Sequence, residues 1–280
     1  MSHVDALTRG HALRLVALTS LMTLASAGCM RNPITGRSEL ILVDDAQAAQ
    51  QGRTVFNEYL RKIPRSRNVT ATRLVEQVVH RLATCGDPNL RAFPWNVVLF
   101  ESNQLNAFAL PGGHVGVYTG ILPVAANEAG LAAILGHEMG HVVARHSAED
   151  LTRSMVLDKG VGIIQDTVLK SKVKTSKNRD EIMQGGAVAL DLLVQKPFSR
   201  AQETEADEMG HNFMACAGYD PHEAPNVWRR MIQAGAGNGV ELLSTHPDPQ
   251  NRIAALMQGL SKVIPIYQRA PRKYGIGVRF

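Results

Sequence analysis

Apolar positions recur with two different periods along this chain of 280 residues. A recurrence every three or four residues is typical of an amphipathic helix, whereas alternation is typical of a half-buried strand. The helical period predicts helices over 46–62, 72–83, 127–143 and 199–217. Alternation between turn residues predicts short strands over 95–101, 106–110 and 114–119. The pattern therefore indicates an α+β fold that is mostly helical, with a small β-sheet beside the helix of 127–143.

The two later helices carry recognisable end signals. Asn127 is a good N-terminal cap for the first of them, and Gly218 suits the left-handed C-terminal cap of the second. Gly136 and Gly140 lower the helix propensity of the first helix. The space that they leave would admit another segment, either close to a bound metal or simply in tight helix packing.

The start of the chain is typical of an exported protein. Arg9 and Arg14 precede an apolar run over 15–27, which has the length of a signal-peptide core and is too short to cross a bilayer. We expect a signal peptide over 1–28, a linker over 29–45, one domain over 46–262 and a basic tail over 263–280.

Composition narrows the class of protein. Hydrophobic residues make up 45% of the chain, which is enough for one substantial core. The net charge of +5 is modest, and no pattern of basic and aromatic residues points to nucleic acid.

The basic stretch 170–179 is either a solvated loop or a lid over a cleft. Besides Cys29 only Cys85 and Cys216 occur, and they either form one disulfide or stay as two thiols.

The candidate chemistry centres on His137-Glu138-Met139-Gly140-His141. Residues four apart lie on one face of a helix, so both imidazoles can reach one ion. Glu138 lies about 100° around the helix from His137, so it can hold a water molecule instead of the metal. This H-E-x-x-H arrangement is typical of zinc hydrolases. It predicts one Zn²⁺ per chain, with His137 and His141 as ligands and Glu138 as the catalytic base.

A catalytic zinc normally has three protein ligands, so a third must be found. The continuation H-x-x-G-x-x-H fails, because Ala144 and Ser147 stand at its glycine and histidine positions. His146 is one residue out of register and is predicted to lie at the surface.

The helix of 199–217 offers other ligands. Glu203, Asp207 and His211 share one of its faces. An acidic helix face is more often merely solvated, and spacing alone leaves the choice among the three residues open.

Four sequence blocks together resemble the HtpX/BepA/LoiP-type zinc metallopeptidases, metallopeptidase family forty-eight, with the mitochondrial OMA-type protease as a cousin. The blocks are N-A-F-A-L-P-G-G at 106–113, N-E-A through H-E-M-G-H at 127–141, F-S-R-x-x-E-x-E-A-D at 198–207, and S-T-H-P at 244–247 followed by Arg252-Ile253. The resemblance implies a zincin-like fold and peptide hydrolysis. It also implies Glu203 as the third zinc ligand and Asp207 as the partner of a ligand histidine.

The resemblance assigns roles to two later residues. In BepA-like members the histidine of the S-T-H-P block can occupy the open zinc position, so His246 is expected as a regulatory fourth ligand; the alternative is an ordinary loop histidine. Arg252 either supports transition-state charge or braces the loop, and we favour bracing.

Zinc would lower the pKa of its water toward about 7, and Glu138 would carry the proton from that water to the leaving amine.

Substrate binding is predicted at the strands over 106–119. An edge strand beside the metal could pair with an extended peptide through main-chain hydrogen bonds, which tolerate many sequences. Unfolded or misassembled proteins are the substrates that fit this mode. The alternative is an ordinary core hairpin.

Ser26-Ala27-Gly28-Cys29 resembles a bacterial lipobox, in which Cys29 is lipidated and becomes the mature N-terminus. Ser26 departs from the usual leucine, so a soluble periplasmic protein is the alternative. Asn32 to Arg37 also resembles the start of lipoprotein members, and no helical repeats of the BepA kind follow. We therefore expect a LoiP-like outer-membrane lipoprotein in envelope quality control, with envelope assembly or protease partners as a further option. A noncatalytic, zinc-stabilised chaperone or adaptor is the second functional hypothesis.

Overall fold

The computed structural model describes residues 29–32, 35–85, 87–154, 193–194, 197–235, 244–246 and 248–275. Its helices include α2 (Asp45–Lys62), α3 (Val69–Ala83), α4 (Pro88–Arg91), α5 (Leu122–Ala125), α6 (Glu128–Val143), α10 (Arg200–Cys216), α11 (Glu223–Gly235) and α13 (Pro249–Arg269). Its strands are β1 (Cys29–Arg31), β2 (Ser38–Leu40), β3 (Asn96–Phe100), β4 (Ala107–Leu110) and β5 (His114–Tyr118). The predicted helices and strands are confirmed, with ends that differ by a few residues, and so is the α+β class.

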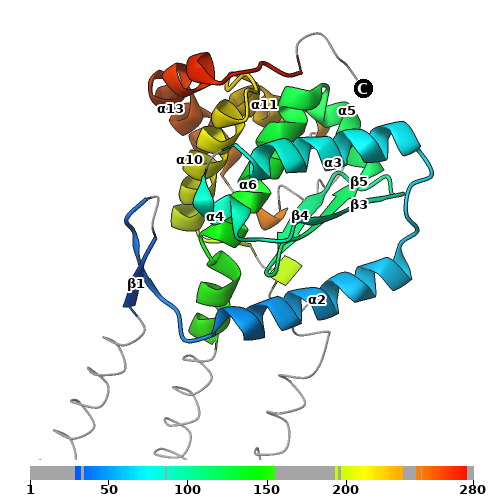
Figure 1. Cartoon of the computed structure of the whole chain (residues 1–280), viewed down its shortest axis with the longest axis vertical. Helices are drawn as coiled ribbons and strands as arrows, with labels where there is room; N and C mark the ends of the chain where they lie inside the picture. The colour runs from blue at the N-terminus through cyan, green and yellow to red at the C-terminus, as the bar shows by residue number, and fades with distance from the viewer. Residues whose placement is uncertain are drawn as a thin grey trace, which may run out of the picture.

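Helix α6 lies at the centre of the molecule, in contact with α3, α10, α11 and β4 (Figure 1). It is buried nearly all round, as expected of a helix that crosses a core. The Asn127 side chain accepts a hydrogen bond from the Gly130 N–H at 2.8 Å, which confirms the predicted cap. The helix ends at Val143. Arg145 then adopts a left-handed conformation (φ 58°) and turns the chain into a further helical run over 146–154.

Helices α6 and α10 touch backbone to backbone at two levels. A Cβ added at Gly136 would lie 2.9 Å from the carbonyl oxygen of Gly210, and one added at Gly210 would lie 2.6 Å from the backbone nitrogen of His137. One turn further along, a Cβ at Gly140 would lie 3.0 Å from the carbonyl oxygen of Ala206. The glycines therefore pack the two helices tightly, and this packing brings α10 up to the H-E-x-x-H segment.

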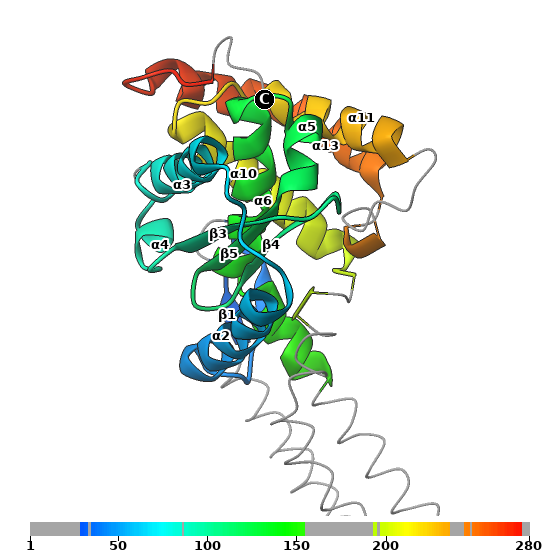
Figure 2. The ribbon, with the colours of Figure 1, turned by 90° about the vertical axis from the view of Figure 1, so that its right-hand side faces the viewer.

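A three-stranded sheet flanks α6, in the order β3-β5-β4. Strand β5 pairs parallel to β3 and antiparallel to β4, and Gly112 and Gly113, both with positive φ, form the predicted turn between β4 and β5. One face packs on α3 and α6 through residues such as Val117, and the other packs on α2 through an aromatic cluster that includes Phe56 and Phe108. Figure 2 shows α2 and α3 on opposite sides of this sheet. Within the described residues, β4 is an edge strand.

The segment after Cys29 is more ordered than the predicted linker. Strand β1 pairs antiparallel with β2, which makes a hairpin. Arg37 in this hairpin ion-pairs with Glu149 at 2.8 Å and with Glu205 on α10. These charges are distant in sequence, which is why no local pattern revealed that the segment packs on the domain.

The C-terminal part also departs from the predicted boundary at 262. Helix α13 continues to Arg269, and beyond it the ring of Tyr274 packs against Tyr219 at 5.8 Å between centroids. The predicted signal peptide over 1–28 and the basic stretch 170–179 lie outside the described residues. Across the part of the chain that the structure describes, no helix combines the length and apolarity needed to span a bilayer.

Candidate metal centre

Four buried side chains converge beside α6: His137 and His141 of that helix, Glu203 of α10, and His246. One ligand atom of each lies within 4.8 Å of all the others. His137 Nε2 is 3.0 Å from His141 Nε2 and 3.2 Å from His246 Nδ1. Glu203 Oε1 is 2.9 Å from His246 Nδ1 and 3.5 Å from His141 Nε2. The structure thus brings together the three expected ligands and the expected regulatory histidine.

The group fits a tetrahedral zinc ion. Zinc lies about 2.0–2.1 Å from imidazole and carboxylate ligands, which places neighbouring ligand atoms about 3.3 Å apart. The separations above lie on both sides of that value. Imidazole nitrogen and carboxylate oxygen are also ligand types that zinc accepts. Facing lone pairs at these distances in a buried site are costly without a shared cation, so the donor set itself favours a metal.

Asp207 fixes the orientation of the His137 ring. His137 Nδ1 lies 3.0 Å from Asp207 Oδ1, so this nitrogen donates to the carboxylate and Nε2 is left bare toward the other ligand atoms. Arg252 Nη2 is also 3.0 Å from His137 Nδ1, but only the carboxylate can accept the imidazole proton. Burial would raise the pKa of Asp207, but Arg252 and His137 outweigh burial and hold that pKa well below its usual range. The contact between Asp207 and His137 is the one expected of a residue that partners a ligand histidine.

Arg252 braces two carboxylates of α10 at once. Its Nε and Nη2 donate to the two oxygens of Asp207 at 2.7 and 2.6 Å, and its Nη1 lies 2.6 Å from Glu203 Oε2. The guanidinium carbon lies 3.7 Å from the centre of the Trp228 ring. Burial would raise the pKa of Glu203, but His246 and Arg252 keep it lowered. These contacts hold two carboxylates of α10 in place, whereas the predicted bracing of the loop by Arg252 stays a prediction.

His141 is enclosed on two sides. The Phe198 ring stacks on it at 4.0 Å between centroids, and its Nδ1 lies 2.8 Å from Nδ1 of His146. Burial and the neighbouring His137 lower the pKa of His141, so the ring is neutral, as a metal ligand must be. The prediction that His146 lies at the surface is wrong, because His146 is fully buried. The left-handed turn at Arg145 redirects it, and no spacing rule that assumes a continuous helix could have found it.

Glu138 lies next to the cluster with an unused acceptor. It is buried, and its Oε1 makes no hydrogen bond to any residue that the structure describes, while His246 Nε2 is 3.5 Å away. Burial raises the pKa of Glu138 above that of an ordinary carboxyl, although His246 and His137 oppose the shift. A buried carboxylate with a raised pKa, whose Oε1 accepts no hydrogen bond from the described residues, suits a group that takes and returns a proton.

His246 is the fourth donor, and it contacts Glu203 at 2.9 Å and Glu138 at 3.5 Å. Burial alone would lower its pKa, but Glu203 and Glu138 outweigh burial and raise it. The remaining candidate ligand, His211, is turned away, because its Nε2 contacts the carbonyl oxygen of Pro221 at 3.0 Å. Of the three alternatives on α10, geometry therefore brings only Glu203 into the cluster.

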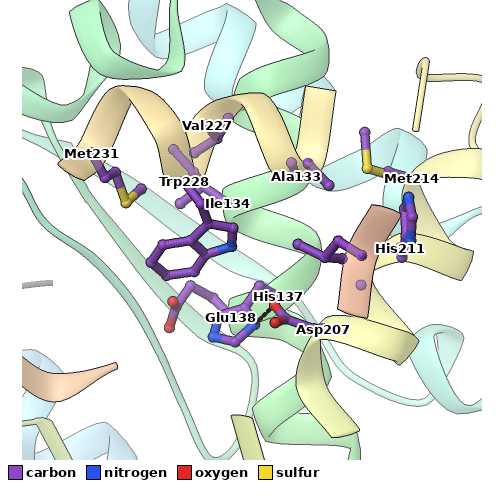
Figure 3. Close-up of a pocket in the computed structure, with 13 residues that line it drawn as sticks. Ala133, Ile134, His137, Glu138, Asp207, His211, Met214, Val227, Trp228 and Met231 are labelled. Atoms are coloured by element: carbon purple, nitrogen blue, oxygen red, sulfur yellow. Dashed lines mark ion pairs between the residues drawn. The ribbon is translucent and has the colours of Figure 1, made fainter. Parts of the chain in front are cut away.

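An apolar pocket adjoins the site (Figure 3). Trp228, Val227 and Met231 of α11 and Ile134 of α6 line it, and Glu138 lies at one side. Trp228 was not among the residues predicted to form the site. Its periodic position in α11 carries no chemical signal, and only the fold places it beside Arg252.

Residues 70–259 match peptidase family M48. The chain is 35% identical over 171 residues to mitochondrial metalloendopeptidase OMA1 of Saccharomyces cerevisiae, which covers 59% of this chain and 46% of that protein. It is 34% identical over 235 residues to mitochondrial metalloendopeptidase OMA1 of Schizosaccharomyces pombe, with 81% and 65% covered. It is 28% identical over 178 residues to the beta-barrel assembly-enhancing protease of Escherichia coli, with 62% and 36% covered. The matched region thus makes up less than two thirds of each relative.

Proposed function

The chain belongs to peptidase family M48, a family of zinc-dependent metallopeptidases, and from that premise we propose that it is a zinc endopeptidase that cleaves unfolded or misassembled envelope proteins. The observation that carries the proposal is the pairing of a four-donor cluster with Glu138, whose Oε1 accepts no hydrogen bond from the described residues. A purely structural zinc site needs its ligands but has no use for an additional carboxylate that accepts no hydrogen bond beside them.

In this proposal the chain's own residues divide the work. His137, His141 and Glu203 would hold a zinc ion, which would supply Lewis-acid chemistry to a water molecule and to the substrate carbonyl. Glu138 Oε1 accepts the proton of the attacking water and returns it to the nitrogen of the leaving amine. Asp207 keeps His137 in the tautomer whose Nε2 is free, and Arg252 holds Asp207 and Glu203 in place.

We further propose that His246 keeps the site latent. Its Nδ1 lies among the other ligand atoms, 2.9 Å from Glu203 Oε1, so it occupies the position that a water would need. Movement of the segment that carries His246 would open that position. The alternative, an ordinary loop histidine, is less compatible with its burial inside the cluster.

For substrate recognition we propose pairing with β4. This strand packs on α6, and among the described residues it pairs on one side only, with β5. An extended peptide added at its free edge would bind through main-chain hydrogen bonds and thus with little sequence preference. The apolar pocket beside Glu138 favours an apolar side chain next to the cleaved bond.

We place this activity in the bacterial envelope. The lipobox-like segment that ends at Cys29 supports a LoiP-like lipoprotein of the outer membrane that faces the periplasm, with a soluble periplasmic form as the alternative. The Escherichia coli relative is named for enhancing β-barrel assembly, which supports envelope proteins as substrates and envelope assembly factors as partners.

The test combines zinc content with cleavage of unfolded casein, on protein that begins after Cys29. We expect zinc in the wild type, Glu138→Gln and His246→Ala, with cleavage lost only in Glu138→Gln and raised in His246→Ala. Glu208→Gln is the matched control, because Glu208 lies on the same helix as Glu203 but is exposed. Zinc without cleavage in every variant would instead support the noncatalytic chaperone or adaptor.

A further inference from the structure

The nitrogen of His141 that faces away from the metal ligands is engaged by a buried relay. His141 Nδ1 lies 2.8 Å from His146 Nδ1, and His146 Nε2 lies 3.0 Å from Glu205 Oε2. His146 has no exposed surface, and the side chain of Glu205 is only 3% exposed. Neither residue takes part in the chemistry described so far.

Hydrogen-bond chemistry fixes the proton positions in this relay. Glu205 can only accept when it is ionised, so His146 Nε2 carries the hydrogen that it donates. A neutral imidazole that donates through one nitrogen accepts through the other, so His146 Nδ1 accepts from His141 Nδ1, 2.8 Å away. His141 Nε2 is then bare as well, and this is the nitrogen that faces His137 and Glu203. One tautomer of each ring satisfies every contact.

The far end of the relay belongs to the hairpin that follows Cys29. Thr35 Oγ1 and Arg37 Nε both donate to Glu205. Together with His146 Nε2, these groups direct three hydrogen-bond donors at the Glu205 carboxylate. Arg37 also ion-pairs with Glu149, on the same helical run as His146.

We propose that His146 is a positioning residue for His141, and that Thr35 and Arg37 complete the metal site by holding Glu205 behind it. The inference rests on the zinc site of the proposed function but not on peptide hydrolysis. It means that the segment directly after Cys29 is energetically coupled to the metal, because disturbing the hairpin releases Glu205, then His146, then the ring of His141. Loss of a group that orients a ligand histidine typically lowers metal affinity about 10–100-fold.

The experiment measures the zinc dissociation constant by competition with a chromophoric chelator, at one fixed pH. His146→Phe keeps a ring but removes the acceptor, and we expect zinc affinity to fall about 10–100-fold. His146→Gln retains an acceptor and a donor, so it should recover most of that loss. Arg37→Met should lower affinity by a smaller factor. Arg153→Met is the matched control, because Arg153 contacts Glu149 but has no contact with Glu205 among the described residues, and its affinity should equal the wild type.

A second readout separates positioning from general packing. Long-range ¹H–¹⁵N NMR of the imidazoles reports the tautomers in metal-free protein, and His141 should be protonated at Nδ1 in the wild type and His146→Gln but mixed in His146→Phe. Wild-type affinity in His146→Phe, or equal losses in His146→Phe and His146→Gln, would overturn the proposal. If His146→Phe does not fold, the zinc affinities of Arg37→Met and Arg153→Met are compared instead. Equal affinities of these two variants would refute the coupling between the hairpin and the metal site. Tight zinc binding by a wild type that cleaves nothing would overturn the proposed function and leave this inference standing.

Discussion

The two histidines that α6 contributes to the candidate metal centre contact different supporting residues, which come from opposite ends of the chain. His137 is held directly by Asp207, which is locked by Arg252 of α13. His141 is held through His146 and Glu205, with Arg37 of the N-terminal hairpin at the far end. The side chain of Arg252 is 4% exposed and that of Arg37 is 25% exposed. The support of His137 has one intervening residue and is buried, whereas the support of His141 has two intervening residues and ends at a partly exposed arginine. Equivalent substitutions in the two supports should therefore have unequal effects.

The largest effect should come from breaking the short support. Arg252→Met leaves the buried Asp207 and Glu203 without their cation, and removing one partner of a buried pair costs about 3–5 kcal/mol. We expect a loss of that size in the free energy of unfolding in urea, measured on metal-free protein so that zinc binding does not contribute. Arg200→Met, at an exposed position, is the control. A loss no larger than that of the control would contradict a buried bracing role.

The next largest effect should be a difference in zinc affinity between substitutions of Asp207 and of Glu205. Asp207→Asn weakens the acceptor that touches a ligand ring, so affinity should fall about 10–100-fold. Glu205→Gln acts through the intervening His146 and should cost less. Chelator competition on both variants at one pH measures the difference. Equal losses would show that the longer relay transmits its effect undiminished.

Salt should distinguish the two arginines. Arg37→Met removes a partly exposed cation, and we expect a loss of about 1 kcal/mol at low salt. That loss should shrink in 1 M NaCl because ions screen exposed charges over about 3 Å at that concentration. The loss caused by Arg252→Met should not change with salt. Urea unfolding of both variants at both ionic strengths measures these losses. A loss for Arg37→Met that does not change with salt would mean that its ion pairs are shielded from solvent.

The smallest effect concerns pH and Glu39 of the hairpin. Burial raises the pKa of Glu39 to about 7, and the nearby Glu205 and Glu149 add to this, while Arg37 and Asn32 oppose it. A raised carboxyl pKa contributes stability at acidic pH that is lost as pH rises through about 7. Glu39→Gln should therefore melt higher than the wild type at pH 8 by on the order of 2–4 °C. The difference should be smaller at pH 5, and a melting-temperature difference that is the same at both values would count against this assignment.

Much of the fold was predictable because its determinants are local. The cap at Asn127, the glycine turn at 112–113 and the periodicity of α6 act within a few residues, and each led to the correct element. The convergence of His137 and His141, with Glu138 beside them, was equally predictable, because the helix converts their spacing directly into geometry. Glu203 was one of three possibilities by spacing, and resemblance to a family was needed to prefer it.

The rest depends on contacts between distant segments. His146 was wrongly predicted to lie at the surface because Arg145, a non-glycine residue, adopts a left-handed conformation. Nothing in the local sequence predicts that conformation. Arg37 was assigned to a linker because its partners are 112 and 168 residues away. Charge pairs of this kind have no period, so they become visible only when the fold brings the partners together.

The contact between Gly136 and Gly210 has a consequence for the motion of the site. Because the main chains of α6 and α10 already touch there, the two helices cannot move closer, and a slide along their axes would drive side chains into backbone. The spacing between His137 and Glu203 is therefore set by the peptide framework before any ion arrives. We expect the distance between His137 and Glu203 to fluctuate only slightly on the picosecond to nanosecond timescale. Because that distance is held within a narrow range, the cluster should discriminate among divalent cations by size.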